Sequence, residues 1–189
     1  TISSAGVITF NTVPDFETKS SYAVTVNVGD GTSSTSQSLA ISVPNVNESP
    51  TAVALSATSI AENAAGATVG TLSSTDVDSS DTFTYALTGT DASSFEISGS
   101  TLKLKDSVSA DYESQTSYAV TVTTTDAGGL TSSQAFTVSV TNANESPTAV
   151  ALSASAIIEN ASGATVGTLS STDVDSGDTF TYTLSGTDA

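Results

Sequence analysis

Residues 142–147 read Asn-Ala-Asn-Glu-Ser-Pro and repeat residues 45–50, which read Asn-Val-Asn-Glu-Ser-Pro, at a separation of 97 positions. The match extends well beyond this hexapeptide, because residues 49–91 and 146–188 have almost the same amino-acid sequence. Self-similarity at a fixed period indicates a tandem array and changes the meaning of every local motif. The hexapeptide is therefore the seam between repeats of about 97 residues.

The two seams divide the 189 residues into one complete repeat and two partial ones. We expect residues 1–46 to be the C-terminal half of a repeat, residues 47–144 (the middle repeat) to be complete, and residues 145–189 to be the N-terminal half of the next. Residues 1–46 match the back half of the middle repeat, except that the turn after Asp30 is one residue shorter than the turn after Asp126. A length change confined to a turn is what packed strands permit.

Apolar and polar residues alternate in several short runs, which predicts half-buried β-strands. Tyr118, Val120 and Val122 point to one side of such a strand, and the residues between them point to the other. The run around Gly70 breaks this parity, so we expect a bulge or bend there. About seven strands per repeat, separated by turn residues and without a helical period, predict an all-β fold: a tandem Greek-key β-sandwich.

The predicted core consists of the apolar residues that share strand parity. They are Val53, Leu55, Ile60, Val69, Leu72, Phe83, Tyr85, Leu87, Phe95, Ile97, Leu102, Leu104, Tyr118, Val120, Val122, Phe136, Val138 and Val140.

Composition excludes several classes of function. With 20 acidic and 3 basic residues the formal net charge is −17, so nucleic acid and anionic membranes are not partners. No apolar run approaches the roughly 18 residues of a membrane span, which argues against direct membrane insertion. The absence of Cys and His removes disulfides, thiolate metal sites and the common catalytic bases and nucleophiles, so we do not expect an enzyme.

The carboxylates of the middle repeat fall mostly in turns or at strand ends. One interpretation is simple solvation, since a soluble β-protein needs surface charge. However, several acids recur at corresponding positions of the repeats, and clustered carboxylates repel one another unless they are neutralised. Ligands that are all oxygen suit Ca²⁺, which takes about 6–8 of them.

The placement of these acids resembles the cadherin-like tandem repeats of large bacterial surface and adhesion proteins. The resemblance covers the whole chain and implies a cadherin/Ig-like sandwich with Ca²⁺ bound where successive repeats meet. It implies a ligand set at each of two junctions, named here after their linkers. At the second junction (linker 142–147) the implied ligands are Glu62, Asp111, Glu113, Asn142, Asn144, Glu145, Asp173 and Asp175. At the first junction (linker 45–50) they are Asp15, Glu17, Asn45, Asn47, Glu48, Asp76, Asp78 and Asp126.

The linkers depart from the family pattern. Asn45 and Asn142 stand where the family has Asp, so each linker carries less negative charge. The reduced charge predicts fewer ions or weaker binding at each junction. Asp81 and Asp178 either join a site or cap a turn, and the sequence leaves both roles open.

The first functional hypothesis is a calcium-stiffened structural or adhesive segment of an extracellular stalk or surface filament, secreted or at the cell surface and without catalysis. Its partners would be neighbouring repeats of the same chain or copies of itself, together with a surface glycan or protein ligand. One alternative is a carbohydrate-binding module of a secreted protein. Another is a subunit that polymerises by half-domain complementation, because residues 1–46 and 145–189 together make nearly one domain.

Overall fold

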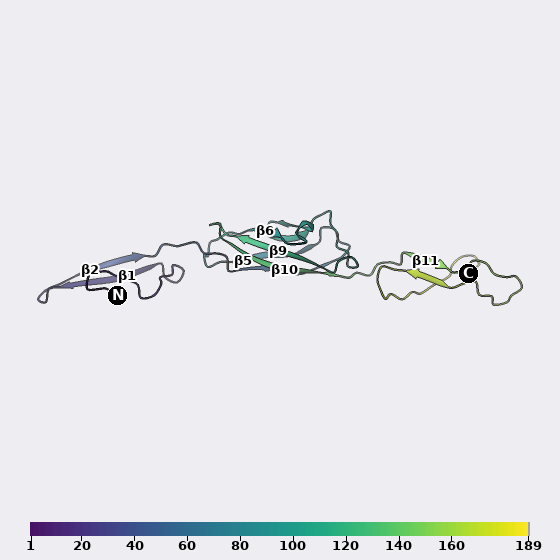
Figure 1. Cartoon of the computed structure of the whole chain (residues 1–189), viewed down its shortest axis with the longest axis horizontal. Helices are drawn as coiled ribbons and strands as arrows, with labels where there is room; N and C mark the ends of the chain where they lie inside the picture. Colours follow the sequence, from purple (N-terminus) through teal and green to yellow (C-terminus); the bar gives the residue numbers. More distant parts are fainter. Residues whose placement is uncertain (189) are drawn as a thin grey trace.

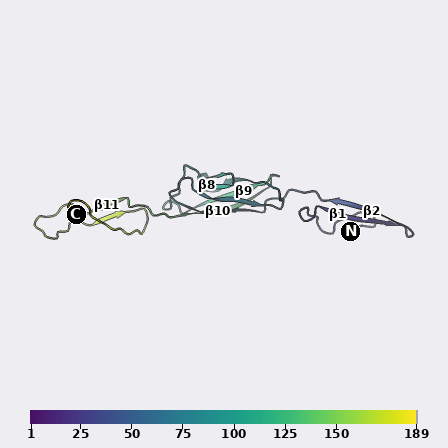
Figure 2. The same cartoon turned by 180° about the vertical axis from the view of Figure 1, so that it is seen from behind.

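The computed structural model describes residues 1–188, and its strands form three bodies that follow one another along a line (Figure 1). Figure 2 shows the same linear order from behind. The first body is the antiparallel pair β1 (Ser21–Gly29) and β2 (Ser34–Ser42), and the last is the antiparallel pair β11 (Ala149–Leu152) and β12 (Leu169–Thr172). Within residues 1–188, no helix is long and apolar enough to cross a membrane.

The body in the middle is a sandwich of two four-stranded sheets. One sheet has the order β4-β10-β9-β6 and the other has the order β3-β5-β8-β7. The strands are β3 (Ala52–Leu55), β4 (Ser59–Ala61), β5 (Thr68–Thr75), β6 (Thr84–Thr88), β7 (Phe95–Ser98), β8 (Thr101–Leu104), β9 (Ser117–Thr125) and β10 (Thr131–Thr141), and one 3₁₀ turn (Ala92–Ser94) precedes β7. The predicted all-β fold is thus confirmed.

The first edge segment of the sandwich is split between the two sheets. β3 pairs antiparallel with β5, whereas β4, which begins four positions after β3 ends, pairs parallel with β10 in the other sheet. A strand that changes sheets in this way lets a single edge segment close both layers. This split raises the strand count above the expected seven.

The core lies between the two sheets of the sandwich. Tyr118, Val120 and Val122 on β9 are buried, and their neighbours in the sequence face outward or lie half-buried, as the alternation predicts. Phe95 meets the Tyr118 ring edge to face, with 5.3 Å between ring centroids. Phe83 lies just before β6 and is only half-buried, so its predicted place in the core was wrong.

The remaining predicted core residues pack as expected. The other buried members are Val53, Ile60, Val69, Leu72, Leu102, Leu104, Val138 and Val140, and Leu55, Tyr85, Leu87, Ile97 and Phe136 are partly buried against them.

The predicted irregularity at Gly70 is present. The pairing of β5 with β8 shifts register between Thr68 and Gly70. A Cβ at Gly70 would lie 2.8 Å from Ser56 Oγ and 2.9 Å from the backbone nitrogen of Ala57, so only glycine fits where the segment after β3 crosses β5.

The same sequence is buried in the middle body and exposed in the last one. Val53 in β3 is 8% exposed, whereas Val150, its counterpart in the repeated Ala-Val-Ala-Leu segment, is 67% exposed. Both strands pair antiparallel with one neighbour. The difference arises because, within residues 145–188, the segment has no second sheet packed against it.

Candidate metal centres at the two junctions

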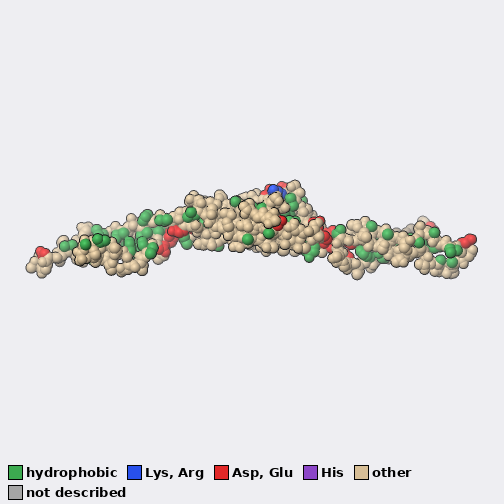
Figure 3. Space-filling view, in the orientation of Figure 1, with side chains coloured by type: hydrophobic (Ala, Val, Ile, Leu, Met, Phe, Trp, Pro, Cys, Tyr) green, Lys and Arg blue, Asp and Glu red, His purple; other side chains and the backbone are tan. Residues whose placement is uncertain are grey.

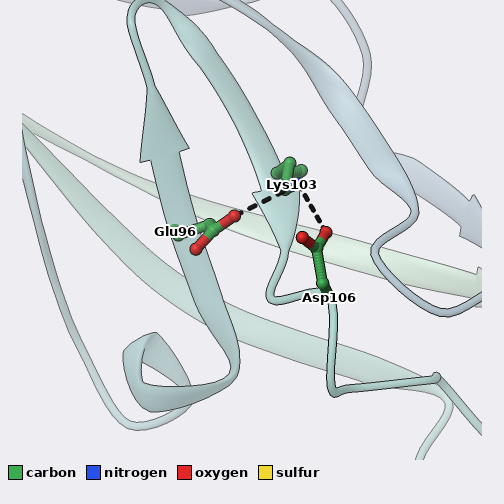
Figure 4. A network of polar contacts seen from close by, with 3 residues as sticks. All are labelled: Glu96, Lys103 and Asp106. Atoms are coloured by element: carbon green, nitrogen blue, oxygen red, sulfur yellow. Dashed lines mark hydrogen bonds and ion pairs between the residues drawn. The ribbon is translucent and has the colours of Figure 1, made fainter.

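Carboxylates gather at the two joins between the three bodies (Figure 3). Within residues 1–188, the only side-chain ion pairs are those of Lys103 (Figure 4). Its Nζ lies 3.1 Å from Glu96 Oε1 and 2.6 Å from Asp106 Oδ1. These residues lie on or beside β7 and β8, away from the joins. Lys19 instead lies over the Tyr22 ring, 4.5 Å from its centroid. The acids at the joins therefore have no cationic side-chain partner in the described chain.

Glu62 connects three segments at the second junction. It follows β4 directly and is 4% exposed. Its Oε2 accepts a hydrogen bond from the backbone amide of Tyr112 at 2.8 Å, and its Oε1 accepts one from the amide of Ala143 at 2.7 Å. A carboxylate held by two amides is fixed in place and pulls the linker onto the end of the sandwich.

The turn before β9 brings two more acids to Glu62. Asp111 accepts hydrogen bonds from the Ser114 amide at 3.0 Å and the Ser114 hydroxyl at 2.8 Å, which closes the turn. This turn places Glu113 beside Glu62. Oxygens of Glu62, Asp111 and Glu113 lie within 4.8 Å of one another.

The next repeat adds its own acids to the same junction. The backbone amide of Glu145 donates to Asp175 Oδ2 at 2.8 Å, and Asp175 is 8% exposed. Oxygens of Glu113, Glu145 and Asp175 form a second group within 4.8 Å, and those of Asp173, Asp175 and Asp178 form a third. Because the groups share Glu113 and Asp175, acids from both sides of the linker form one continuous cluster.

The first junction has the same plan. The backbone amide of Glu48 donates to Asp78 Oδ2 at 3.1 Å, as Glu145 does to Asp175. The acids form two groups, and within each group the oxygens lie within 4.8 Å of one another. One group is Glu17, Glu48 and Asp78, and the other is Asp76, Asp81 and Asp126. The linker side chains reach the same acids, since Asn45 Nδ2 donates to Asp78 Oδ1 at 2.6 Å and Asn47 Nδ2 donates to Asp126 Oδ2 at 3.0 Å.

Five of the sequence-predicted residues lie outside these acidic groups. Two of them, Asn45 and Asn47, donate hydrogen bonds to acids within the groups, as described above, and the other three do not. Asp15 caps its own turn, where its carboxylate accepts hydrogen bonds from the amides of Glu17 and Thr18 and from the Thr18 hydroxyl. Asn142 is exposed, and Asn144 Nδ2 donates to the backbone carbonyl of Glu145 at 2.7 Å. Asp15 uses its oxygens locally, and the hydrogen bond of Asn144 stays within the linker.

Three other residues join the junctions. Asp81 and Asp178, whose roles the sequence left open, both lie in acidic groups. Asn63 was not predicted: its side-chain amide donates to Glu145 Oε1 across the second junction. The available signal was the Glu-Asn pair, which recurs at 159–160 and has a left-handed asparagine in both copies, with φ of 61° at Asn63 and 65° at Asn160.

Burial and crowding raise the pKa of several acids. Burial, followed by repulsion from Glu17 and Asp78, raises the pKa of Glu48, and burial followed by repulsion from Asp78 raises the pKa of Asp81. Burial followed by repulsion from Glu62 and Asp175 raises the pKa of Glu145. Burial and like charge thus disfavour the ionised form of these acids, and a cation among them would relieve that cost.

Asp126 behaves differently from the crowded acids. Burial acts to raise its pKa, but the hydrogen bonds from Asn47 and from the backbone amides of its own loop outweigh burial, and the net pKa is lowered. These hydrogen bonds therefore favour the ionised form of Asp126, although the residue is only 6% exposed.

Unpaired oxygens test whether these centres fit a cation. Buried carboxylate oxygens without a hydrogen-bond donor occur at both joins: Asp76 Oδ2 and Asp81 Oδ2 at the first, and Glu145 Oε2 and Asp173 Oδ2 at the second. Buried polar atoms are nearly always partnered, so an orphaned acceptor needs an explanation. Oxygen-only clusters with unfilled acceptors fit a hard divalent cation such as Ca²⁺.

Comparisons with known proteins agree with this architecture. The family model described as Cadherin domain matches residues 56–141. Extracellular cadherin domains 1–4 of protocadherin gamma B7 superpose with a TM-score of 0.62 at 22% identity, over 87% of this chain and 43% of that one. The extracellular domain of protocadherin gamma B4 gives a TM-score of 0.59 at 26% identity, over 86% and 28%. Human mucin-like protocadherin EC1-2 gives 0.51 at 21%, over 71% and 74%.

The chain spans less than half the length of the two protocadherin gamma structures. Likeness at this level of identity establishes the fold. A search of curated proteins found no match. The family match over residues 56–141, together with the shared sandwich, identifies the middle repeat as a cadherin-like repeat.

Proposed function

We propose that this chain is part of an extracellular structural or adhesive rod, in which Ca²⁺ bound at each linker stiffens the joint between successive cadherin-like repeats and no catalysis takes place. The observation that supports it most is the set of orphaned buried carboxylate oxygens at both joins. Those oxygens belong to acids that repel one another and lack a cationic side-chain partner within residues 1–188.

The residues proposed to hold calcium are the ligands that the sequence implies at the two junctions. At the first junction they are Asp15, Glu17, Asn45, Asn47, Glu48, Asp76, Asp78 and Asp126, and at the second they are Glu62, Asp111, Glu113, Asn142, Asn144, Glu145, Asp173 and Asp175. Each junction then belongs to two units of the proposed division into residues 1–46, 47–144 and 145–189.

Calcium supplies positive charge that lets carboxylates of successive repeats coexist. Without it, the negatively charged ends on the two sides of a linker repel each other. Extracellular calcium modules have dissociation constants of about 10⁻⁴–10⁻³ M. An ion at ten times its dissociation constant adds roughly 1.4 kcal/mol per site, which is a large part of a small domain's marginal stability.

The proposed location is outside the cell, secreted or at the cell surface. The proposed partners are adjoining repeats and copies of the same chain. A structure of protocadherin gamma B7 EC3-6 is described as a cis-dimer, and its match to this fold supports self-association as one mode of adhesion.

A thermal melt in chelator and in millimolar calcium tests the proposal. Calcium should raise the melting temperature of the chain, and the double variant Glu145→Gln with Asp175→Asn should lose the part of this gain contributed by the second junction. The matched control is Glu96→Gln with Asp106→Asn, which makes the same chemical change in the surface network of Figure 4. The control should keep the full response, and an unchanged melt of the parent chain in calcium would refute the proposal.

A further inference from the structure

The linker of the first junction contacts a buried acid of the next repeat through a side-chain donor. Asn45 Nδ2 lies 2.6 Å from Asp78 Oδ1, and the backbone amide of Glu48 lies 3.1 Å from Asp78 Oδ2. Asp78 follows β5 and is 7% exposed. Both oxygens of this carboxylate therefore accept hydrogen bonds from the linker.

A second linker side chain makes a similar contact. Asn47 Nδ2 donates to Asp126 Oδ2 at 3.0 Å, while the other oxygen of Asp126 accepts the Leu130 amide at 2.8 Å. The loop between β9 and β10 leaves room for this contact at Gly128, where a Cβ would collide with the Asn47 amide group. The loop is shaped around the asparagine side chain.

We propose that Asn45 and Asn47 form a latch that holds the first linker against the next repeat when no calcium is present, with Asn45 as the residue that sets this property. Hydrogen bonds from an amide to a carboxylate are charge-assisted, and a neutral donor relieves an anion without adding charge. An aspartate at position 45 would instead bring a second carboxylate to within hydrogen-bonding distance of Asp78. The latch itself does not depend on the proposed calcium function. Only the behaviour of the junction with calcium bound rests on that proposed function.

The second junction provides an internal comparison. Asn142 is the counterpart of Asn45 in the repeated hexapeptide, and Asp175 is the counterpart of Asp78. Asp175 accepts the backbone amide of Glu145, as Asp78 accepts that of Glu48. Within residues 1–188, however, the Asn142 side chain is exposed and donates no hydrogen bond. The same linker sequence is thus latched at one junction and lacks this contact at the other.

Spin-label distances measured by pulsed EPR on the full chain in chelator test the latch. The sequence has no Cys, so labels can be placed at chosen exposed positions. Ser36→Cys on β2 with Thr137→Cys on β10 reports the first junction, and Thr137→Cys with Ala151→Cys on β11 reports the second.

With Asn45 intact, the first junction should give a narrow distance distribution in chelator. Asn45→Asp, which replaces the donor by an anion, and Asn45→Ala, which only removes the donor, should both lose the narrow component. Ser49→Asp is the matched control, because it adds the same charge to the same linker at an exposed position that holds neither hydrogen bond. It should leave the distribution of the first junction unchanged.

Two results would overturn the latch. One is a narrow distribution that survives in Asn45→Ala, because the lost donor would then have no effect. The other is a broadening by Ser49→Asp equal to that by Asn45→Asp, because added charge alone would then explain both. Calcium is added after the measurement in chelator. If the distance distributions of every chain then stay unchanged, calcium binding at the junctions is refuted. The measurement in chelator still decides whether the latch exists.

Discussion

Among single side chains, Glu62 carries the most connections at the second junction. Its two oxygens accept the amides of Tyr112 and Ala143, and it is 4% exposed. Glu62→Ala should destabilise the middle sandwich by about 1–3 kcal/mol, because it leaves buried backbone donors unpaired. It should also weaken calcium binding at the second junction. Chemical denaturation in chelator measures the first effect, and calcium titration of the folded variant measures the second.

The repeat supplies a matched control for this substitution. Glu159 is the counterpart of Glu62 in the next repeat and is exposed. Glu159→Ala makes the same chemical change without breaking a buried contact, so its free energy of unfolding should stay close to that of the parent chain. Equal losses in the two variants would contradict the role given to Glu62.

A second residue-scale prediction concerns Asp30, in the turn between β1 and β2. Hydrogen bonds from the amide of Thr32 at 2.9 Å, the amide of Ser33 at 2.8 Å and the Thr32 hydroxyl at 2.9 Å lower the pKa of Asp30 from 3.8 to about 2. A lowered carboxyl pKa stabilises the fold above the unfolded value of 3.8, and this contribution is lost as the pH falls toward about 2.

Nuclear magnetic resonance titration of the Asp30 carboxyl carbon in the full chain measures this effect. The midpoint should lie about two pH units below that of an ordinary aspartate. Asp30→Asn supplies the assignment and the control. A midpoint close to 3.8 would show that the turn does not hold its hydrogen bonds in solution.

Among the elements, the loop between β9 and β10 is the one that shows most clearly how a repeat is adapted to its neighbour. Gly128 has no side chain to fill the space that the Asn47 amide occupies, and its φ lies outside the left-handed region. Gly128→Ala should therefore leave the sandwich itself intact and displace Asn47. The corresponding turn after Asp30 is one residue shorter, so the extra residue is found where the loop meets a preceding linker.

A double-mutant cycle with Asn47→Ala measures this contact. Gly128→Ala should broaden the distance distribution of the first junction when Asn47 is present and have little further effect once Asn47 is alanine, because the two substitutions act on one contact. Independent, additive effects would mean that the loop and the linker side chain do not depend on each other.

The strands were predictable where local pattern and tertiary environment agree. Tyr118, Val120 and Val122 alternate because one face of β9 is buried, and the bulge at Gly70 was visible as a break in that parity. Phe83 was misplaced because its parity continues that of β6 while the strand itself begins only at Thr84. The split between β3 and β4 was missed because parity does not report which sheet a short edge segment joins.

The acidic residues of the candidate site were predictable from the sequence. The resemblance to a known family pointed to the residues that cluster at both joins, and repetition distinguished them from scattered surface charge. The contacts of Asn45, Asn47 and Asn63 were not predictable, because a side-chain amide gives no charge signal and its partner is set by the folded linker. Asp15 was an expected ligand whose oxygens are also needed by its own turn.

For the whole molecule, the arrangement of charge matters more than its total. The net charge of −17 would favour an extended chain through general repulsion. The joins add a separate, short-range term, because the oxygens in each acidic group lie within 4.8 Å of one another. Any salt should screen the general repulsion, whereas only a cation that binds among the oxygens should relieve the crowding at the joins. Measurements in different salts therefore separate the two terms.

Small-angle X-ray scattering in chelator, in monovalent salt and in calcium separates the two terms. The Debye length at about 0.1 M monovalent salt is about 10 Å, so such salt screens the separate bodies from one another but hardly affects oxygens that share one group. Calcium at the same ionic strength should narrow the distribution of overall dimensions to that of a straight rod, whereas monovalent salt should leave the second joint bending. Magnesium is the sharper control, because it keeps its waters and demands octahedral geometry, and it should straighten the rod less than calcium does. A rod that straightens equally in all three salts would assign the stiffness to general screening and remove calcium from the joints.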